Sequence, residues 1–266
     1  MTIRVCVAGA TGWAGSALSR GIFETSDMEL VAGISRSQAG KVLGNVLGID
    51  ELTTPIFSTV AKGLETKPDV VVEYTKPDVA RANILSALRG GAHVVVGTSG
   101  LSETDYQEID AVAREVKRGV LAVGNFALTA VLLQKFAEMA ARYIPHWEII
   151  DYAHSGKVDA PSGTARELAD RLSRVRESQL DVPLETMQGP KESRGVRLNG
   201  SQVHSVRLPG YVISVDAIFG MPNQKLIIRH ESGTSAEPYV DGALLAIRKV
   251  AGLVGVHRGL DKVMEF

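Results

Sequence analysis

Residues 3–15 read Ile3-Arg4-Val5-Cys6-Val7-Ala8-Gly9-Ala10-Thr11-Gly12-Trp13-Ala14-Gly15. The apolar run predicts a strand over residues 3–8, and the residues after the glycine turn predict a helix that ends near residue 24. Glycines at a strand-to-helix turn let the backbone approach a pyrophosphate and let the helix pack closely on the strand. The stretch therefore predicts the start of a Rossmann dinucleotide-binding domain, although a structural turn without a nucleotide has the same pattern. The expected cofactor-binding residues here are Gly9, Thr11, Gly12, Trp13 and Ala14.

The rest of the first half alternates between apolar strands and helices. Continuously apolar strands that are separated by helices indicate a parallel sheet with both faces covered. The fold class is therefore α/β, with a Rossmann domain over residues 1–125. The expected strands after the first are residues 29–34, 69–73, 93–96 and 120–123, and the later helices are residues 77–89 and 102–117, with Ser102 as N-cap.

The second half indicates a C-terminal α+β domain with an open mixed sheet over residues 126–234. Turn residues at Pro209-Gly210 and Pro222-Asn223 favour successive antiparallel strands. Thr164 with Glu167 fits a capping box at a helix start, and residues 235–266 are expected to pack back on the first domain. The expected helices are residues 129–143, 164–177 and 239–251, the strands are residues 147–152, 202–208, 211–219 and 225–230, and residues 180–199 form a loop.

The residues after the second expected strand distinguish between the two nicotinamide cofactors. Sites that prefer NADH usually place an acidic residue here, where it binds the ribose 2′-hydroxyl. This chain has Ser35-Arg36-Ser37 instead. A guanidinium with two hydroxyls suits a 2′-phosphate, so NADPH is favoured and NADH remains possible. The alternative is that Arg36 is only a solvated surface charge.

Charge and cysteine content narrow the class of protein. Lys plus Arg number 29 and Asp plus Glu number 30, a net charge of −1, which gives no electrostatic reason to expect nucleic acid or an anionic membrane as partner. Cys6 is the single cysteine; it lies in an apolar run and is expected to be a buried small residue. One cysteine and no signal pattern favour a cytoplasmic protein. No histidine spacing typical of metal ligands is present, so no metal site is expected.

The polar segment over residues 154–164 suggests the chemistry. It carries His154 and Lys157 and leads into a helix that starts near Ser162, Gly163 and Thr164. Free amides at a helix start, two hydroxyls and a lysine suit a small anionic substrate. Lys157 or His154 would then be the proton donor. A helix cap beside a solvated lysine is the alternative.

Residues 157–165, Lys-Val-Asp-Ala-Pro-Ser-Gly-Thr-Ala, resemble the signature of the dihydrodipicolinate reductase family. Three further stretches resemble that family in the same order along the chain. They are Tyr74-Thr75-Lys76-Pro77, Gly97-Thr98-Ser99-Gly100 and Asn125-Phe126-Ala127, which resemble an aromatic turn after a strand, a loop beside the nicotinamide and a hinge between domains.

The resemblance implies an NAD(P)H-dependent reductase that transfers a hydride to the cyclic imine derived from 4-hydroxy-tetrahydrodipicolinate, and it implies a homotetramer assembled through the second sheet. Lys157 would anchor the substrate and donate the proton, and His154 would bind the substrate on its other side. Ser162, Gly163 and Thr164 would hold one carboxylate. The further cofactor-binding residues would be Tyr74, Thr75, Gly97, Thr98, Ser99, Asn125 and Phe126.

Two positions depart from the family pattern. Ala153-His154 stands where the family usually has two histidines, and Ile213-Ser214-Val215 stands where it often has Gly-x-His. Three hypotheses follow. The chain is a lysine-pathway reductase, a divergent family member that reduces another imine or enamine, or a catalytically silent NADPH-binding sensor. The retained Lys157 and carboxylate segment argue against the sensor, because a sensor needs no substrate pocket.

Overall fold

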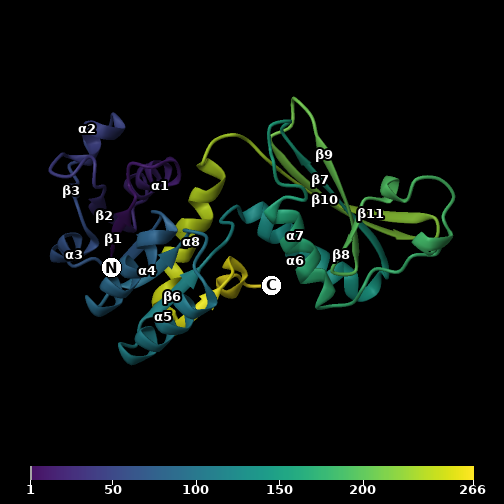
Figure 1. Cartoon of the computed structure of the whole chain (residues 1–266). Coiled ribbons are helices and arrows are strands. Elements are labelled where there is room, and N and C mark those ends of the chain that lie inside the picture. Colours follow the sequence, from purple (N-terminus) through teal and green to yellow (C-terminus); the bar gives the residue numbers. More distant parts are fainter. Residues whose placement is uncertain (1) are drawn as a thin grey trace. The chain divides into compact units, whose positions relative to one another are not determined.

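The computed structural model describes residues 2–266, which form two compact units. Within the described residues, the first unit consists of residues 2–128 and Ala236–Phe266, and the second consists of Thr129–Ser235. Figure 1 colours the chain from its N-terminus in purple to its C-terminus in yellow. Over the part of the chain that is described, no helix combines the length and apolar character that a bilayer crossing requires.

A seven-stranded sheet forms the centre of the first unit, and all its strand pairs are parallel. The strand order is β12-β6-β5-β4-β1-β2-β3, so the order reverses beside β1, where such sheets usually bind ligands at their carboxyl ends. The predicted parallel Rossmann sheet is confirmed. Its strands are β1 (Ile3–Ala8), β2 (Met28–Ile34), β3 (Ile56–Phe57), β4 (Val70–Glu73), β5 (His93–Val96), β6 (Gly119–Ala122) and β12 (Gly255–Arg258).

Helices cover this sheet because its strands are apolar on both sides. The buried residues of three helices, α3 to α5, pack with alternate residues of the strands, among them Cys6 and Ala8. On α1, Gly21 lies directly against Val240 of α8. The expected burial of Cys6 is confirmed, and burial raises the pKa of its thiol to about 12. The helices are α1 (Trp13–Phe23), α2 (Leu43–Leu47), α3 (Val60–Gly63), α4 (Pro77–Arg89), α5 (Glu103–Glu115) and α8 (Val240–Lys249).

Some elements of the first unit are too short for a pattern in the sequence to reveal. The helices α2 and α3 and the strand β3 have two to five residues each. The last strand, β12, pairs with β6 and becomes a strand only through that pairing. By contrast, Ser102 caps α5 as predicted, because its side chain accepts a hydrogen bond from the Asp105 amide at 3.1 Å.

The second unit has a mixed five-stranded sheet in the order β11-β10-β7-β9-β8. The predicted mixed sheet is confirmed, since β7 and β9 are parallel and the other pairs are antiparallel. The expectation of successive antiparallel neighbours is correct for β10 and β11 but wrong for β9 and β10, because β7 lies between them. The strands are β7 (His146–Ala153), β8 (Val196–Leu198), β9 (Ser201–Arg207), β10 (Ile213–Met221) and β11 (Gln224–Ser232).

Two helices, α6 (Leu128–Tyr143) and α7 (Gly163–Ser173), cover one face of this sheet, as Figure 1 shows. Trp147, Ile149 and Phe219 point toward them and form the core of the unit. Helix α7 ends at Ser173 and not near residue 177, and the expected loop over residues 180–199 contains the edge strand β8. The short 3-10 helices of the chain are η1 (Leu64–Thr66), η2 (Leu184–Thr186), η3 (Lys191–Arg194), η4 (Glu237–Tyr239), η5 (Val250–Gly252) and η6 (Leu260–Val263).

Candidate active site

A cavity of about 540 Å³ lies at the carboxyl ends of β1, β2 and β4 in the first unit. The glycine turn forms part of it. Gly9 has a φ of +85°, and a Cβ atom there would overlap the Tyr74 carbonyl, while a Cβ atom on Gly15 would overlap the Gly9 carbonyl. This close approach of backbone segments explains the glycines. The predicted cofactor residues that line the cavity are Gly9, Thr11, Gly12, Ser35, Arg36, Ser37, Tyr74 and Thr75.

The charged side chains that line this cavity are both cationic. Arg36 enters from the end of β2 and Lys76 from the turn before α4, and no carboxylate lines the cavity among the described residues. Thr11 and Ser35 join the two turns, since their hydroxyl oxygens lie 2.8 Å apart. Lys76 is not among the cofactor-binding residues predicted from the sequence. One feature of the sequence could have indicated it. Lys76 directly precedes Pro77, and a residue in that position is usually extended, as Lys76 is here.

Glu73, at the end of β4, is fully buried beneath this cavity wall. Its carboxylate accepts hydrogen bonds from the Thr75 amide at 2.8 Å, from the Thr75 hydroxyl, and from the Asn83 side-chain amide at 2.9 Å. The Thr98 hydroxyl donates to it at 3.4 Å. Burial raises the pKa of Glu73, and these hydrogen bonds oppose the rise. The carboxylate thus connects the β4–α4 turn to the loop after β5.

The other predicted cofactor residues lie outside the lining of the cavity. Gly97 packs against the Tyr74 ring, and Phe126 meets that ring edge-on with centroids 5.7 Å apart. Asn125 accepts a hydrogen bond from the Ala127 amide at 2.9 Å. Trp13 is 61% exposed and meets Tyr239 edge-on at 5.7 Å. Ala14, Thr98 and Ser99 are likewise not among the lining residues.

In the second unit, β7 leads into the loop over residues 154–162, which ends at the start of α7. Lys157 Nζ lies 2.8 Å from Asp159 Oδ1 and is largely buried. The hydrogen bond from Lys157 and its charge hold the pKa of Asp159 below its usual value. His154 is exposed, and its carbonyl accepts from the Lys157 amide at 3.1 Å. The two predicted proton donors therefore belong to one turn of this loop.

The capping box predicted at Thr164 and Glu167 is wrong. Ser162 is the N-cap of α7, because its hydroxyl accepts from the Ala165 amide at 3.3 Å. Glu167 instead binds Arg171 at 3.1 Å. Starting the helix earlier places the amides of Gly163 and Thr164 in its first turn, where they have no partner within the helix. Such amides suit an anion.

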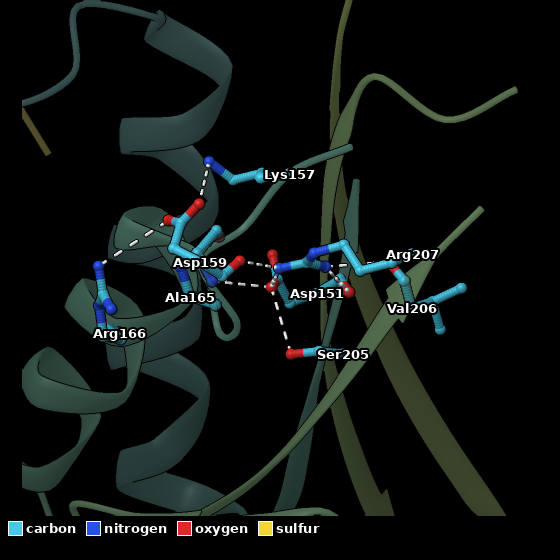
Figure 2. Close-up of polar contacts among 9 residues, drawn as sticks. Asp151, Lys157, Asp159, Ala165, Arg166, Ser205, Val206 and Arg207 are labelled. Carbon is cyan, nitrogen blue, oxygen red and sulfur yellow. Dashed lines mark hydrogen bonds and ion pairs between the residues drawn. The ribbon is translucent and has the colours of Figure 1, made fainter. Parts of the chain in front are cut away.

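The loop rests on a buried ion pair that sequence reasoning missed. Figure 2 shows Asp151 and Arg207 between the sheet and the loop. Arg207 Nη2 donates to Asp151 Oδ2 at 2.7 Å, and the Ser162 amide donates to the same oxygen at 2.8 Å. Ala153, two residues beyond Asp151, is fully buried. No local signal links residues 56 positions apart; only the parallel pairing of β7 with β9 joins them.

Groups that could hold a metal are not part of either region. Among residues 2–266, no cluster of three or more His, Cys, Asp or Glu side chains has the geometry of a metal site.

Comparison with known proteins identifies relatives over almost the whole chain. Residues 3–126 match the family model for the N-terminus of dihydrodipicolinate reductase, and residues 129–264 match the model for its C-terminus. The 4-hydroxy-tetrahydrodipicolinate reductase of Desulfitobacterium hafniense is 39% identical over 267 residues, covering 99% of each chain. That of Bacillus pumilus is 37% identical over 265 residues, covering 99% of this chain and 98% of its own.

Solved structures agree with these matches. A dihydrodipicolinate reductase from Paenisporosarcina sp. TG-14 with dipicolinate bound superposes with a TM-score of 0.89 at 31% identity, covering 99% of this chain and 100% of the other. An amine dehydrogenase from Mycobacterium smegmatis has a TM-score of 0.69 at 16% identity, covering 100% of this chain and 97% of the other, and shares the fold alone.

Proposed function

This chain belongs to the dihydrodipicolinate reductase family, and from that premise we propose that it reduces 4-hydroxy-tetrahydrodipicolinate to tetrahydrodipicolinate in lysine and diaminopimelate biosynthesis. It is a nicotinamide-dependent oxidoreductase. The single observation that carries the substrate is the loop over residues 154–162, which presents Lys157 beside a helix start that is suited to a carboxylate. A cyclic dicarboxylate has the charge that this arrangement recognises.

The preferred cofactor in this proposal is NADPH. Arg36, Ser35, Ser37 and Lys76 line the same cavity, and a guanidinium with an ammonium and two hydroxyls suits the 2′-phosphate that distinguishes NADPH from NADH. The glycine turn at Gly9 would hold the pyrophosphate. When bound, the cofactor supplies the hydride for the reduction.

Lys157 is the proposed anchor and proton donor. One of its three N–H donors points at Asp159, which leaves two for a substrate carboxylate and for the reacting system. His154 is exposed on the same turn and would bind the substrate. Ser162, Gly163 and Thr164 would hold one carboxylate through the Gly163 and Thr164 amides and the Ser162 and Thr164 hydroxyls at the start of α7.

Ala153 favours a second candidate function within the same chemistry. Its fully buried methyl group can neither bind a substrate nor carry a proton, so Lys157 and His154 would perform that task alone. The alternative is a reductase for a different imine or enamine. Both candidates keep the cofactor and the hydride transfer and differ only in the substrate.

We also propose a homotetramer that assembles through the face of the second sheet opposite α6 and α7. Ile150, Ile218 and Ile227 lie on that face, and Ile218 pairs directly with Ile227 across β10 and β11. Ile227 is 47% exposed in a single chain. An apolar patch on an open sheet face is typical of a subunit interface.

Turnover by the purified protein tests the substrate. The cyclic substrate is generated from pyruvate and aspartate semialdehyde by the preceding enzyme, and NADPH oxidation is followed. We expect turnover in the wild type and a loss of roughly 10²- to 10⁴-fold in Lys157→Ala, because a positioned proton donor is removed. The matched control is Lys191→Ala, an exposed lysine of the same unit.

Other outcomes separate the candidates. A protein that binds NADPH and a dicarboxylate but gives no turnover points to a different imine, and a protein that binds NADPH alone is the sensor. Equal activity in Lys157→Ala and Lys191→Ala would remove Lys157 from the mechanism.

A further inference from the structure

A buried ion pair, Asp151 with Arg207, lies beneath the loop over residues 154–162 and outside the groups assigned to chemistry. We infer that these two are positioning residues. They hold the loop and the start of α7 in the one arrangement that binds a carboxylate, and so they set the affinity of the second unit for a dicarboxylate. The inference rests on the proposed function only for the identity of that ligand.

The Asp151 carboxylate collects contacts from two segments besides its own strand. It is fully buried. Its Oδ2 atom accepts from the Ser162 amide at 2.8 Å, from Arg207 Nη2 at 2.7 Å and from the Ser205 hydroxyl at 3.4 Å. The first contact fixes the N-cap residue of α7 against β7, and the other two come from β9. A short carboxylate thus holds the N-cap residue of α7 against the sheet.

The Arg207 guanidinium makes the complementary set of contacts. Its Nη2 atom donates to the Asp159 carbonyl at 2.7 Å in addition to Asp151, and its Nη1 atom donates to the Asp151 and Val206 carbonyls at 3.2 and 2.9 Å. The planar fork thus reaches one carboxylate and three backbone carbonyls at once, and an ammonium group lacks this rigid, fixed arrangement of donors. Arg207 thereby holds the middle of the loop to β9.

Lys157 is connected to this pair through Asp159. The Asp159 backbone is held by Arg207, while its side chain binds Lys157 at 2.8 Å and approaches Arg166 of α7 at 3.9 Å. Figure 2 shows this succession from Arg207 through Asp159 to Lys157. A shift of the Asp159 backbone would therefore move the ammonium group away from the substrate.

A contribution to the free energy of folding does not explain why Asp151 and Arg207 form an ion pair here. Taking two charges out of water costs free energy that their attraction often fails to recover. Here Asp151 Oδ1 and Arg207 Nε also lack a hydrogen-bond partner within residues 2–266. An apolar pair would fill the same space at similar stability. What the ion pair supplies, and apolar residues cannot, is a fixed direction for the Ser162 amide and the Asp159 carbonyl.

Two variants test the inference without leaving an unpaired buried charge. Arg207→Lys keeps the charge but not the fork. The double variant Asp151→Asn with Arg207→Met removes both charges and keeps an acceptor for the Ser162 amide. Dipicolinate, a planar dicarboxylate, serves as the probe, and its affinity is measured by calorimetry. Because small misplacements of binding groups carry large penalties, we expect the affinity to fall roughly tenfold in Arg207→Lys and up to a hundredfold in the double variant.

Three further measurements separate a positioning role from a general loss of stability. We expect an increase in KM for the cyclic substrate that matches the loss of dipicolinate affinity, with unchanged NADPH affinity. Amide hydrogen exchange over residues 154–162 should accelerate. The matched control is Arg171→Met, because Arg171 has a side-chain exposure of 15% against 16% for Arg207 and binds Glu138 away from the loop. This control should leave all three readouts at wild-type values.

The outcomes distinguish this inference from the proposed function. If the wild type binds no dipicolinate and turns over no cyclic substrate, the proposed function fails, and loop exchange alone then decides the positioning role. Wild-type affinity and wild-type loop exchange in both variants would overturn the inference. A loss in Arg171→Met equal to that in the double variant would also overturn it, since the effect would then follow from general destabilisation.

Discussion

At the scale of single residues, Arg36 is the basis of the proposal that this protein prefers NADPH. It shares a cavity with Lys76, and no carboxylate lines that cavity in the described part of the chain. A hydrogen bond to a charged group contributes a net free energy of roughly 1.5–3 kcal/mol. We therefore expect Arg36→Ala to lower kcat/KM for NADPH about tenfold or more while kcat/KM for NADH stays nearly constant. Steady-state kinetics with each cofactor measures this.

The same experiment includes Lys76→Ala and a control. Lys76→Ala should also lower kcat/KM for NADPH relative to that for NADH, because both cations face one cavity. Lys62→Ala, an exposed lysine of α3 that does not line the cavity, should change neither value. Equal losses for NADPH and NADH in Arg36→Ala would show that the guanidinium does not recognise the 2′-phosphate.

At the scale of elements, Glu73 joins β4, α4 and the loop after β5 through its buried carboxylate. Burial raises the pKa of Glu73 from its ordinary value of 4.5. The folded protein thus holds this proton more tightly than the unfolded chain. The contribution of Glu73 to stability is then largest below pH 4.5 and is lost as the pH rises through the folded-state pKa.

Glu73→Gln removes this titration and retains the size of the side chain. We expect the free energy of unfolding of the wild type, relative to Glu73→Gln, to decrease as the pH rises from 4.5 toward neutrality. Urea unfolding of both proteins at several pH values measures the difference. A difference that is constant with pH would show that burial does not raise the pKa of Glu73.

At the scale of the whole molecule, the face of the second sheet opposite α6 and α7 is the proposed interface between subunits. Four copies of a 28.4 kDa chain have a mass of about 114 kDa. Light scattering after gel filtration should give that mass for the wild type and a smaller one for Ile227→Asp, because a charge would be buried at the interface. Phe23→Asp is the control, since Phe23 is 41% exposed on α1 in the other unit. Equal masses for all three proteins would place the interface elsewhere.

The sequence by itself determined the features that depend on neighbouring residues. The apolar runs located β1, β4 and β5, and the spacing of Gly9, Gly12 and Gly15 located the turn between β1 and α1. Ser102 identified the start of α5 because a cap bonds only a few residues away. The stretch from Lys157 to Thr164 indicated the family by its resemblance, and it located the loop that is proposed to bind substrate, because its groups lie within one loop and one helix turn.

The tertiary structure alone decided what depends on contacts between distant segments. It inserted β7 between β9 and β10, and it brought Lys76 into the cavity of Arg36. It also joined Asp151 to Arg207 across parallel strands. Thr164 and Glu167 fitted a capping box, yet Ser162 caps the helix, and Asp151 of β7 holds the Ser162 amide. Strand order and buried charge pairs are set by the packing of the whole core, and local propensity does not encode them.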